Sequence, residues 1–375
     1  MKFLVLNHFF GEFTGSEINA LQLCVALREA GHVADIGTFE MRGLLLERTR
    51  QHGISVLNVR EDDGPPLDYD VIWAHHAPVL THLLFRRSLG PCRVVFSSLS
   101  PLTPMESPPT YFEELPRVLA HSPYNVDYLR DLGLPAERIF YFPNFAPKAF
   151  FARQRPVRDG GLRRIAVVSN HPPEEVRQMA ATARNDGMTV DFIGQEERPV
   201  YVDETVLTAY DLVISIGKTV PYAFAQRVPV YCYDHFGGPG YLHADNFERA
   251  RHGNFCGRSF WRKLTADELF ADIQAGYASV TPATLDFLHA KACALFSLEA
   301  NLEAFCVELA AMPVTDVEAI RRRHGAAGRL NDVYMGVLRH RLALEDQLRA
   351  RVELPVPSSP PPEPRRRSWW SGFLR

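Results

Sequence analysis

The amino-acid sequence predicts an α/β fold with two doubly wound, Rossmann-like domains that face a cleft, followed by C-terminal helices and a disordered tail. Two observations predict this fold. Short apolar runs rich in Val, Ile and Phe alternate with helix-length segments. The alternation stops at a segment rich in Pro, Arg and Gly and then starts again. Such alternation is typical of a parallel sheet covered on both faces. The length of 375 residues also suits two domains better than one.

The first domain is expected over residues 1–146. Its first strand is Phe3–Asn7, and a Gly-containing turn leads to a helix over Ser16–Ala30, which Gly31 closes. Apolar residues at the 3.6-residue period support this helix. Six more strands are expected at Val33–Thr38, Ile54–Val59, Val71–His75, Arg93–Ser98, Val118–Ala120 and Ile139–Phe142.

Residues 147–161 lack periodicity and are expected to link the domains. The second domain is expected over residues 162–312. Its strands are predicted at Arg164–Ser169, Thr189–Gly194, Asp211–Ile216 and Val228–Tyr233, and two of its helices at Pro173–Asn185 and Val220–Arg227. A charged helical pattern predicts an extension over residues 313–354, which either packs on the first domain or pairs two chains.

Composition excludes several classes of protein. A net charge of −3 gives no reason to expect nucleic-acid binding. The six cysteines are scattered without a CxxC pair, so we expect reduced thiols in a cytoplasmic protein and no zinc site. No apolar run is long enough to span a bilayer, and the N-terminal run is interpreted as a buried strand, with a signal peptide as the alternative.

The last 21 residues differ from the rest of the chain, because they hold six of the 28 prolines and two of the four tryptophans. The prolines predict an extended segment over residues 355–364. The end has the composition of an anchor at the membrane interface, through Arg365, Arg366, Arg367, Trp369 and Trp370. A solvated, disordered end is the alternative.

The turn between the first strand and the first helix holds Gly15 and Ser16. Backbone N–H groups at a helix start can bind an anion such as a phosphate. The alternative needs no ligand, since Ser16 can cap the helix. The turn does not match GxGxxG, so it is not a dinucleotide fingerprint.

Two histidines, His75 and His76, follow a predicted parallel strand. Ligands of open α/β sheets bind beyond such strand ends. A neutral imidazole there can act as a general base or donate to a sugar hydroxyl. The alternative is that one of the pair is only a structural residue at the strand end. The nearby Asp68-Tyr69-Asp70 matches a metal-binding DxD only formally, because it precedes the strand.

The segment from residue 211 to 258 holds most of the candidate donor-site residues. Gly217, Lys218 and Thr219 lie between a strand and a helix, a combination suited to a diphosphate. A second candidate group follows the next strand, where glycines let a backbone approach a ligand and an aromatic ring can pack on a base or sugar: Asp234, His235, Phe236, Gly237 and Gly238. The alternatives are an Asx-type turn at Asp234 and a solvated side chain at Lys218.

Three stretches make the chain resemble bacterial glycosyltransferases of the GT-B fold, closest to the family 4 type found in surface-polysaccharide synthesis. They are FGEFTGSEINALQLCVALREAGHVADIGT, VLAHSPYNVDYLRDLGLPAERIFYFPN and DLVISIGKTVPYAFAQRVPVYCYD. The resemblance covers roughly residues 1–310. It implies a hexosyltransferase-like enzyme whose second domain holds a nucleotide-diphosphate sugar and whose first domain binds a glycan or lipid-linked glycan. It also implies transfer without a metal or a bound cofactor, on the inner face of the plasma membrane.

The sequence departs from this family at the donor site. The positions of the family's two glutamates fall near Ser215 and Tyr222, and the usual Arg and Lys after the first strand of the second domain are replaced by a segment that starts with Ser169 and Asn170. Lys218 is expected to supply the missing cation, and Asn254 and Arg258 are candidates to reach the diphosphate. Two alternatives keep the fold: a degenerate module that binds a sugar nucleotide or a partner without transfer, and a sugar-nucleotide epimerase, against which the missing carboxylates argue.

Overall fold

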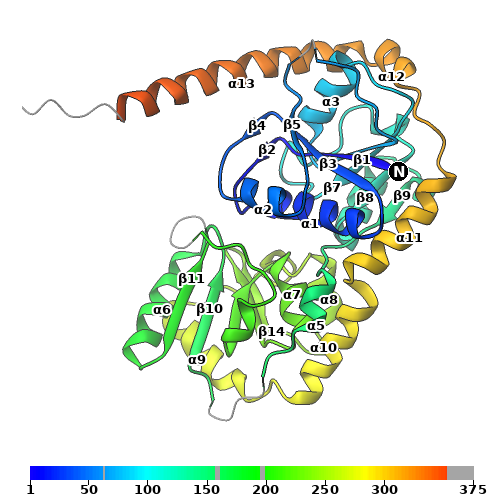
Figure 1. The fold of residues 1–375 in the computed structure, drawn as a ribbon. Coiled ribbons are helices and arrows are strands. Elements are labelled where there is room, and N and C mark those ends of the chain that lie inside the picture. Colours follow the sequence, from blue (N-terminus) through cyan, green and yellow to red (C-terminus); the bar gives the residue numbers. More distant parts are fainter. Residues whose placement is uncertain (62–63, 157–160, 195–198, 353–375) are drawn as a thin grey trace, which may run out of the picture. The chain divides into compact units, whose positions relative to one another are not determined.

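The computed structural model describes residues 1–61, 64–156, 161–194 and 199–352. The chain divides into two units, Met1–Gly328 and Arg329–Arg375. The first unit contains two extended β-sheets, which define a first and a second Rossmann-like domain (Figure 1). The predicted tail, including Arg365, Arg366, Arg367, Trp369 and Trp370, lies outside the described residues.

The first sheet has seven parallel strands in the order β5-β3-β1-β6-β7-β8-β9. Most of its strands are continuous apolar runs, as expected for a sheet covered on both faces. The strand order reverses between β1 and β6, as in a Rossmann fold. The strands are β1 (Lys2–Leu6), β3 (Val33–Thr38), β5 (Val56–Asn58), β6 (Val71–Ala74), β7 (Arg93–Ser98), β8 (Arg117–Ala120) and β9 (Ile139–Tyr141).

Helices and short strands complete the first domain. Apolar residues of α1, among them Leu21, Leu23 and Leu27, are buried in the core of this sheet. A short parallel pair, β2 (Phe9–Phe10) and β4 (Glu40–Met41), lies outside the main sheet. The helices are α1 (Gly15–Glu29), α2 (Leu45–Gln51), α3 (Ala77–Arg86) and α4 (Pro123–Asp131), and α5 (Lys148–Ala152) follows in the segment predicted as a linker.

The second sheet has the order β11-β10-β12-β13-β14, and its first four strands are parallel. These four strands were expected, and their bounds agree with the prediction to within two residues. They are β10 (Arg164–Val168), β11 (Thr189–Ile193), β12 (Leu212–Ser215) and β13 (Val230–Asp234). Its helices include α6 (Glu174–Asn185), α7 (Thr219–Ala225), α8 (Phe247–His252), α9 (Ala266–Tyr277) and α10 (Pro282–Leu295).

The strand β14 (Gly237–Tyr241) pairs antiparallel with β13 and was not predicted. The sequence predicts instead that Gly237 and Gly238 lie in a loop that approaches a ligand. A Cβ atom on Gly237 would lie 2.1 Å from the carbonyl oxygen of Arg262, and one on Gly238 would lie 2.0 Å from that of Cys232. Close packing against the protein's own backbone therefore explains these glycines.

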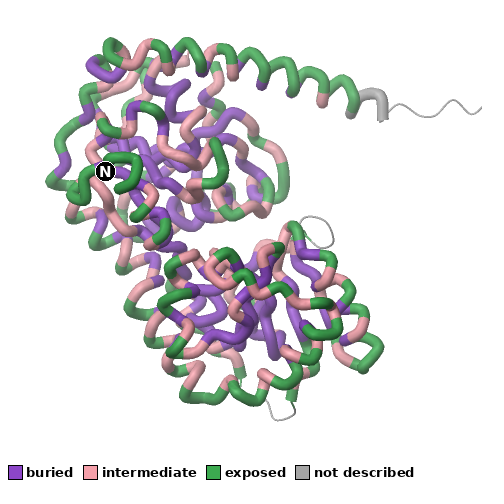
Figure 2. Tube along the Cα trace, turned by 180° about the vertical axis from the view of Figure 1, so that it is seen from behind, coloured by how far each residue is buried: buried purple, intermediate pink, exposed green. Residues whose placement is uncertain are grey.

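The helix α11 (Leu298–Ala311) packs on the first sheet, although the second domain was expected to extend to residue 312. Leu302 and Leu309 are buried in the first core, and the Phe305 ring centroid lies 4.8 Å from that of Trp73. The chain thus returns to the first domain from residue 298 onward, because the apolar face of α11 completes that core. Figure 2 shows buried residues gathered inside both domains.

Two helices end the described chain, α12 (Val317–Arg323) and α13 (Gly325–Val352). Most of α13 is exposed to solvent (Figure 2). Within the described ranges, no helix combines the length and the apolar character needed to cross a membrane.

Candidate functional site

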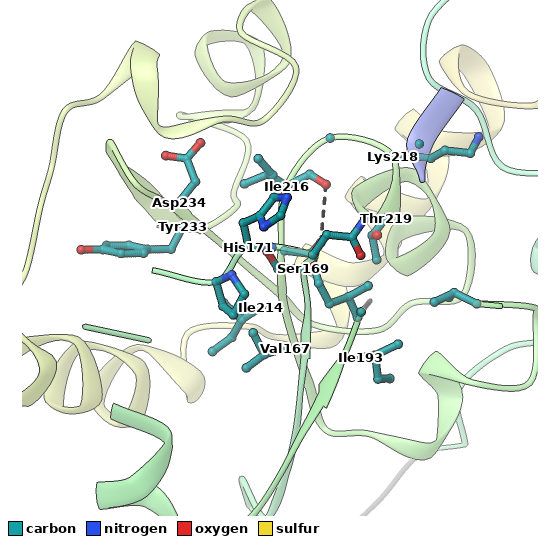
Figure 3. Close-up of a pocket in the computed structure, with 18 of the residues that line it drawn as sticks. Val167, Ser169, His171, Ile193, Ile214, Ile216, Lys218, Thr219, Tyr233 and Asp234 are labelled. Atoms are coloured by element: carbon teal, nitrogen blue, oxygen red, sulfur yellow. Dashed lines mark hydrogen bonds between the residues drawn. The ribbon is translucent and has the colours of Figure 1, made fainter. Parts of the chain in front are cut away.

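A cavity of about 530 Å³ opens at the carboxyl ends of β10 and β12 (Figure 3). The order of the second sheet reverses between these two strands, and sheets of this kind bind ligands at such a reversal. Ser169 and Asn170 follow β10, and Gly217 follows β12, so both strand ends supply lining residues.

The start of α1 forms another part of the cavity wall, through Phe13, Gly15 and Ile18. A Cβ atom on Gly15 would meet no atom within 4 Å, so the backbone here faces open space. The helix begins at Gly15 with Thr14 as its N-cap. The alternative in which Ser16 caps the helix is therefore wrong.

The buried carboxylate of Glu17 accepts hydrogen bonds from the turn before α1. Its Oε2 accepts N–H groups from Gly11 at 2.7 Å and Glu12 at 2.6 Å, and its Oε1 accepts the hydroxyl of Thr14 at 3.0 Å. Burial raises the pKa of this carboxyl to about 7, against the opposing effect of these hydrogen bonds. Glu17 thus holds the loop that presents Gly15 to the cavity.

The fold brings most of the predicted donor-site residues to one cavity. Those that line it are Gly15, Ser169, Asn170, Gly217, Lys218, Thr219, Asp234, His235 and Phe236. The predicted residues outside the lining are Ser16, His75, His76, Gly237, Gly238 and Arg258. Gly237 and Gly238 are outside it because they form β14.

Asp234 uses its carboxylate inside the protein. Oδ1 accepts the N–H of Phe236 at 2.8 Å, and Oδ2 accepts the N–H of Gly257 at 3.0 Å. This geometry is the Asx-type turn expected as the alternative at Asp234. The neighbouring His235 is exposed, and its Nε2 lies 3.0 Å from the carbonyl oxygen of His171.

Arg258 lies behind a ring at the cavity edge. Its guanidinium carbon is 4.3 Å from the centroid of the Phe236 ring, which lines the cavity. Trp261, 67% exposed, meets the same ring edge-on at 5.2 Å. Arg258 thus supports an aromatic rim and does not line the cavity itself.

The side chain of Lys218 extends away from Ser169 and His171 (Figure 3). Its Nζ lies 3.8 Å from the centroid of the Phe145 ring and 5.3 Å from that of Tyr222. This nitrogen is buried and has no hydrogen-bond partner among the described residues. Burial holds the pKa of Lys218 well below its usual value. The alternative of a solvated side chain is therefore wrong.

Two buried histidines lie within electrostatic reach of Lys218. His75 follows β6 and His121 follows β8, and each is at most 4% exposed. Burial, and then the neighbouring His121, His76 and Lys218, hold the pKa of His75 well below its usual value. Burial, followed by Lys218, lowers the pKa of His121 to about 3. Both imidazoles are therefore neutral at neutral pH.

The two adjacent histidines differ in their hydrogen bonds. His76 accepts the backbone N–H of His8 at Nδ1, at 2.9 Å, and its Nε2 lies 3.8 Å from Glu106. His75 Nδ1 is buried and has no hydrogen-bond partner among the described residues. His76 thus has a structural role at the strand end, and His75 keeps a ring nitrogen available.

Two polar residues next to this group, His121 and Asn144, were not predicted from the sequence. His121 hydrogen-bonds Asn144, whose Nδ2 donates to Oδ1 of Asn254 at 3.0 Å. Asn254 has a left-handed backbone with φ of 55°, and a Cβ atom on Gly217 would lie 3.6 Å from its Nδ2. For His121 the signal was present, because it follows a parallel strand as His75 does. No local pattern marks Asn144.

The positions without the family glutamates have other tasks. Ser215 donates to the carbonyl oxygen of Val168 at 2.7 Å, and Tyr222 donates to Oε1 of Gln22 at 2.8 Å. Of the described residues that line the cavity, Asp234 alone carries a carboxylate. In the same described part of the chain, no three His, Cys, Asp or Glu residues are placed to hold a metal ion.

Comparisons with known proteins identify the fold class. No family model and no curated protein matches the sequence. The chain is similar to Anabaena HepE, solved in complex with UDP-glucose, with a TM-score of 0.53 at 15% identity over 83% of this chain and 100% of HepE. It is also similar to a glycosyltransferase from Rickettsia africae, with a TM-score of 0.52 at 10% identity over 82% of this chain and 98% of that one. Together with the two Rossmann-like sheets, these similarities show that the chain has the GT-B fold.

Proposed function

We propose that the protein transfers a sugar from a nucleotide-diphosphate sugar to a glycan or glycolipid acceptor. The observation that supports this function is the cavity at the carboxyl ends of β10 and β12, with the start of α1 in its wall. The position and size are those of a nucleotide site in a doubly wound sheet. HepE, which shares the fold, was solved with UDP-glucose, and this supports the same class of donor.

Lys218 is the proposed cation of the reaction. As the bond between the sugar and the diphosphate breaks, negative charge develops on the leaving group and requires stabilisation. Among the described residues, Lys218 Nζ has ring contacts but no hydrogen-bond partner, so an incoming diphosphate would be its first counter-charge. This role assumes that the side chain turns from Phe145 toward the cavity when the donor binds.

His75 is the proposed base. In this step the acceptor oxygen attacks the anomeric carbon, the bond to the diphosphate breaks with its electron pair, and the acceptor proton moves to Nδ1 of His75. Nδ1 of His75 is unoccupied among the described residues, and the role assumes that the bound donor raises the pKa of His75 and opens this nitrogen to the acceptor. The proposed transfer inverts the anomeric centre and uses no metal and no bound cofactor.

The acceptor and the setting are further parts of the proposal. We place the enzyme near family 4, as a hexosyltransferase-like enzyme of surface-polysaccharide synthesis that works at the inner face of the plasma membrane. Charge supports membrane contact, because residues 329–375 carry nine Arg against five Asp or Glu in a chain with net charge −3.

A second candidate function is binding without transfer. The observation that favours it is the use of Ser215 and Tyr222 for internal hydrogen bonds at the positions of the family glutamates. A module of this kind would bind a sugar nucleotide and leave it intact.

Two measurements separate these functions. Calorimetry with UDP and GDP tests binding, and a screen of nucleotide sugars read by mass spectrometry and NMR detects transfer, hydrolysis or epimerised product. Binding with transfer supports the enzyme, and binding without any turnover supports the module. An epimerised product would contradict both functions and indicate an epimerase. If no nucleotide binds, the assignment of the cavity as a donor site is wrong.

A further inference from the structure

The helix α13 carries a stripe of aliphatic side chains on its exposed side. The exposed fractions of these residues range from 45% to 71%, and on an ideal helix all of them fall within an arc of about 60°. They are Leu330, Val333, Val337, Leu344 and Leu348. An exposed apolar stripe of this length requires an explanation.

The stripe is distinct from the apolar side that α13 already buries. Met335, Leu338 and Leu342 are at most 4% exposed and lie on the opposite part of the helix surface. A helix that covers only one surface needs only one apolar side. The second stripe therefore indicates a second partner.

The spacing and width of the stripe indicate what kind of partner this is. Leu330, Val337 and Leu344 occupy position a of a heptad repeat. Position d holds Val333, His340 and Gln347, and Leu348 occupies the flanking position e. A narrow a/d stripe is typical of a coiled-coil seam, whereas a helix that lies on a core or a membrane has a wider apolar face. The partner should therefore be another helix.

We propose that α13 pairs with α13 of a second copy of this chain, as a parallel, in-register coiled coil. Each copy carries the same stripe, so the seam is self-complementary. In this register, no pair of residues that flank the seam brings two like charges together. The flanking pairs are Arg329 with Tyr334, Gly336 with Arg341, and Ala343 with Leu348.

His340 occupies a core position of this seam and faces its counterpart. Gln347 occupies the next d position, and polar residues at core positions set register and lower the stability of the pair. The small residues Gly336 and Ala343 beside the seam let the two helices approach closely, and a Cβ atom on Gly336 would meet nothing within 4 Å.

Light scattering of the full chain over a range of concentrations tests the proposal. The unmodified protein should shift to the mass of a dimer as concentration rises. The double variant Val337→Glu/Leu344→Glu should raise the dimer dissociation constant by at least about 100-fold, since it places charges in the seam. Val307→Glu is the matched control, because Val307 on α11 is 71% exposed and lies outside the stripe. It should dimerise normally.

Two further variants test the register. Val337→Cys should form an intermolecular disulfide under mild oxidation, beyond the background of the unmodified chain, in which Cys293 is already exposed. His340→Leu should tighten the dimer. Circular dichroism of each variant verifies that the helices persist.

Two results would overturn the proposal. The unmodified chain could stay monomeric at every concentration, or the double variant could dimerise as well as the unmodified chain. If the unmodified chain stays monomeric, a loss of binding to phosphatidylglycerol vesicles in the double variant would assign the stripe to a lipid surface.

Discussion

The ammonium nitrogen of Lys218 lies 3.8 Å from the centroid of the Phe145 ring. Lys218 follows a strand of the second sheet, and Phe145 is buried in the core of the first. A cation on an aromatic face is attractive, but the contact does not replace the hydration that a buried ammonium loses. A buried amine in this position reduces the stability of the free protein, and a bound anion would supply the counter-charge that it lacks.

Replacing Lys218 should separate activity from stability. Lys218→Met should lower kcat/KM for donor turnover by about 10²-fold, the scale for a lost charge-stabilising group. It should also raise the Tm at neutral pH by about 2–4 °C, because a buried amine without a hydrogen-bond partner is removed. Steady-state kinetics and thermal unfolding measure the two effects.

Lys263→Met is the matched control for this substitution, because its side chain is 62% exposed. It should change neither quantity. An unchanged rate in Lys218→Met would show that another group stabilises the leaving diphosphate.

Nucleotide binding should take up protons. Burial holds the pKa values of Lys218, His75 and His121 low, neighbouring charged groups lower those of the two histidines further, and a bound diphosphate would raise all three. More protons are then bound in the complex than in the free protein, so affinity for UDP should increase as pH falls from about 9 to about 6.

Calorimetry in phosphate and in Tris measures this uptake, because the two buffers release protons with different enthalpies. Lys218→Met should reduce the difference in binding enthalpy between the two buffers. If the binding enthalpy is the same in both buffers, Lys218, His75 and His121 take up no protons when the nucleotide binds.

The sequence predicted the strands well because a parallel sheet buries both faces. An apolar run such as Val94–Phe96 marks such a strand without regard to the rest of the fold, and β7 has the predicted bounds, Arg93–Ser98. The strand β14 could not be predicted in this way. Its glycines have low strand propensity, and their contacts with Arg262 and Cys232 come from tertiary structure.

Periodicity also could not assign α11 to a domain. It shows which face of a helix is apolar, but it does not show which sheet that face covers, and Phe305 packs against Trp73 of the first sheet. The same limit applies at the site. Strand ends located Lys218 and His75, whereas the direction of the Lys218 side chain depends on Gly217, which has a left-handed φ of 55°.

Glu17 should make the stability of the protein depend on pH. Burial raises the pKa of its carboxyl from 4.5 to about 7. A raised pKa in the folded state contributes stability that is present below 4.5 and is lost as pH rises through about 7. Glu17→Gln removes the titrating group, so its stability should not fall with this titration. The stability of the variant minus that of the unmodified protein should therefore be larger at about pH 8 than at about pH 4.5.

Thermal unfolding at both pH values measures this effect. Glu137→Gln changes an exposed carboxylate outside this turn and should leave the pH dependence as it is. Equal pH profiles for Glu17→Gln and the unmodified chain would contradict the assignment.

Asp211 should be among the most costly charges to remove. Arg155 donates to its Oδ1 at 2.8 Å, and the N–H groups of Arg163 and Arg164 donate to its Oδ2. The side chains of Arg155 and Asp211 are 10% and 5% exposed. Asp211→Ala leaves the guanidinium of Arg155 buried without its counter-charge, and the free energy of unfolding should fall by about 3–5 kcal/mol.

Urea denaturation measures this loss. The exposed pair between Glu47 and Arg50, at 3.0 Å, supplies the control, and Glu47→Ala should cost at most about 1 kcal/mol. The double substitution Asp211→Leu/Arg155→Met should recover part of the lost stability, because it removes both charges together. A loss for Asp211→Ala as small as that for Glu47→Ala would show that water reaches Arg155 in the folded protein.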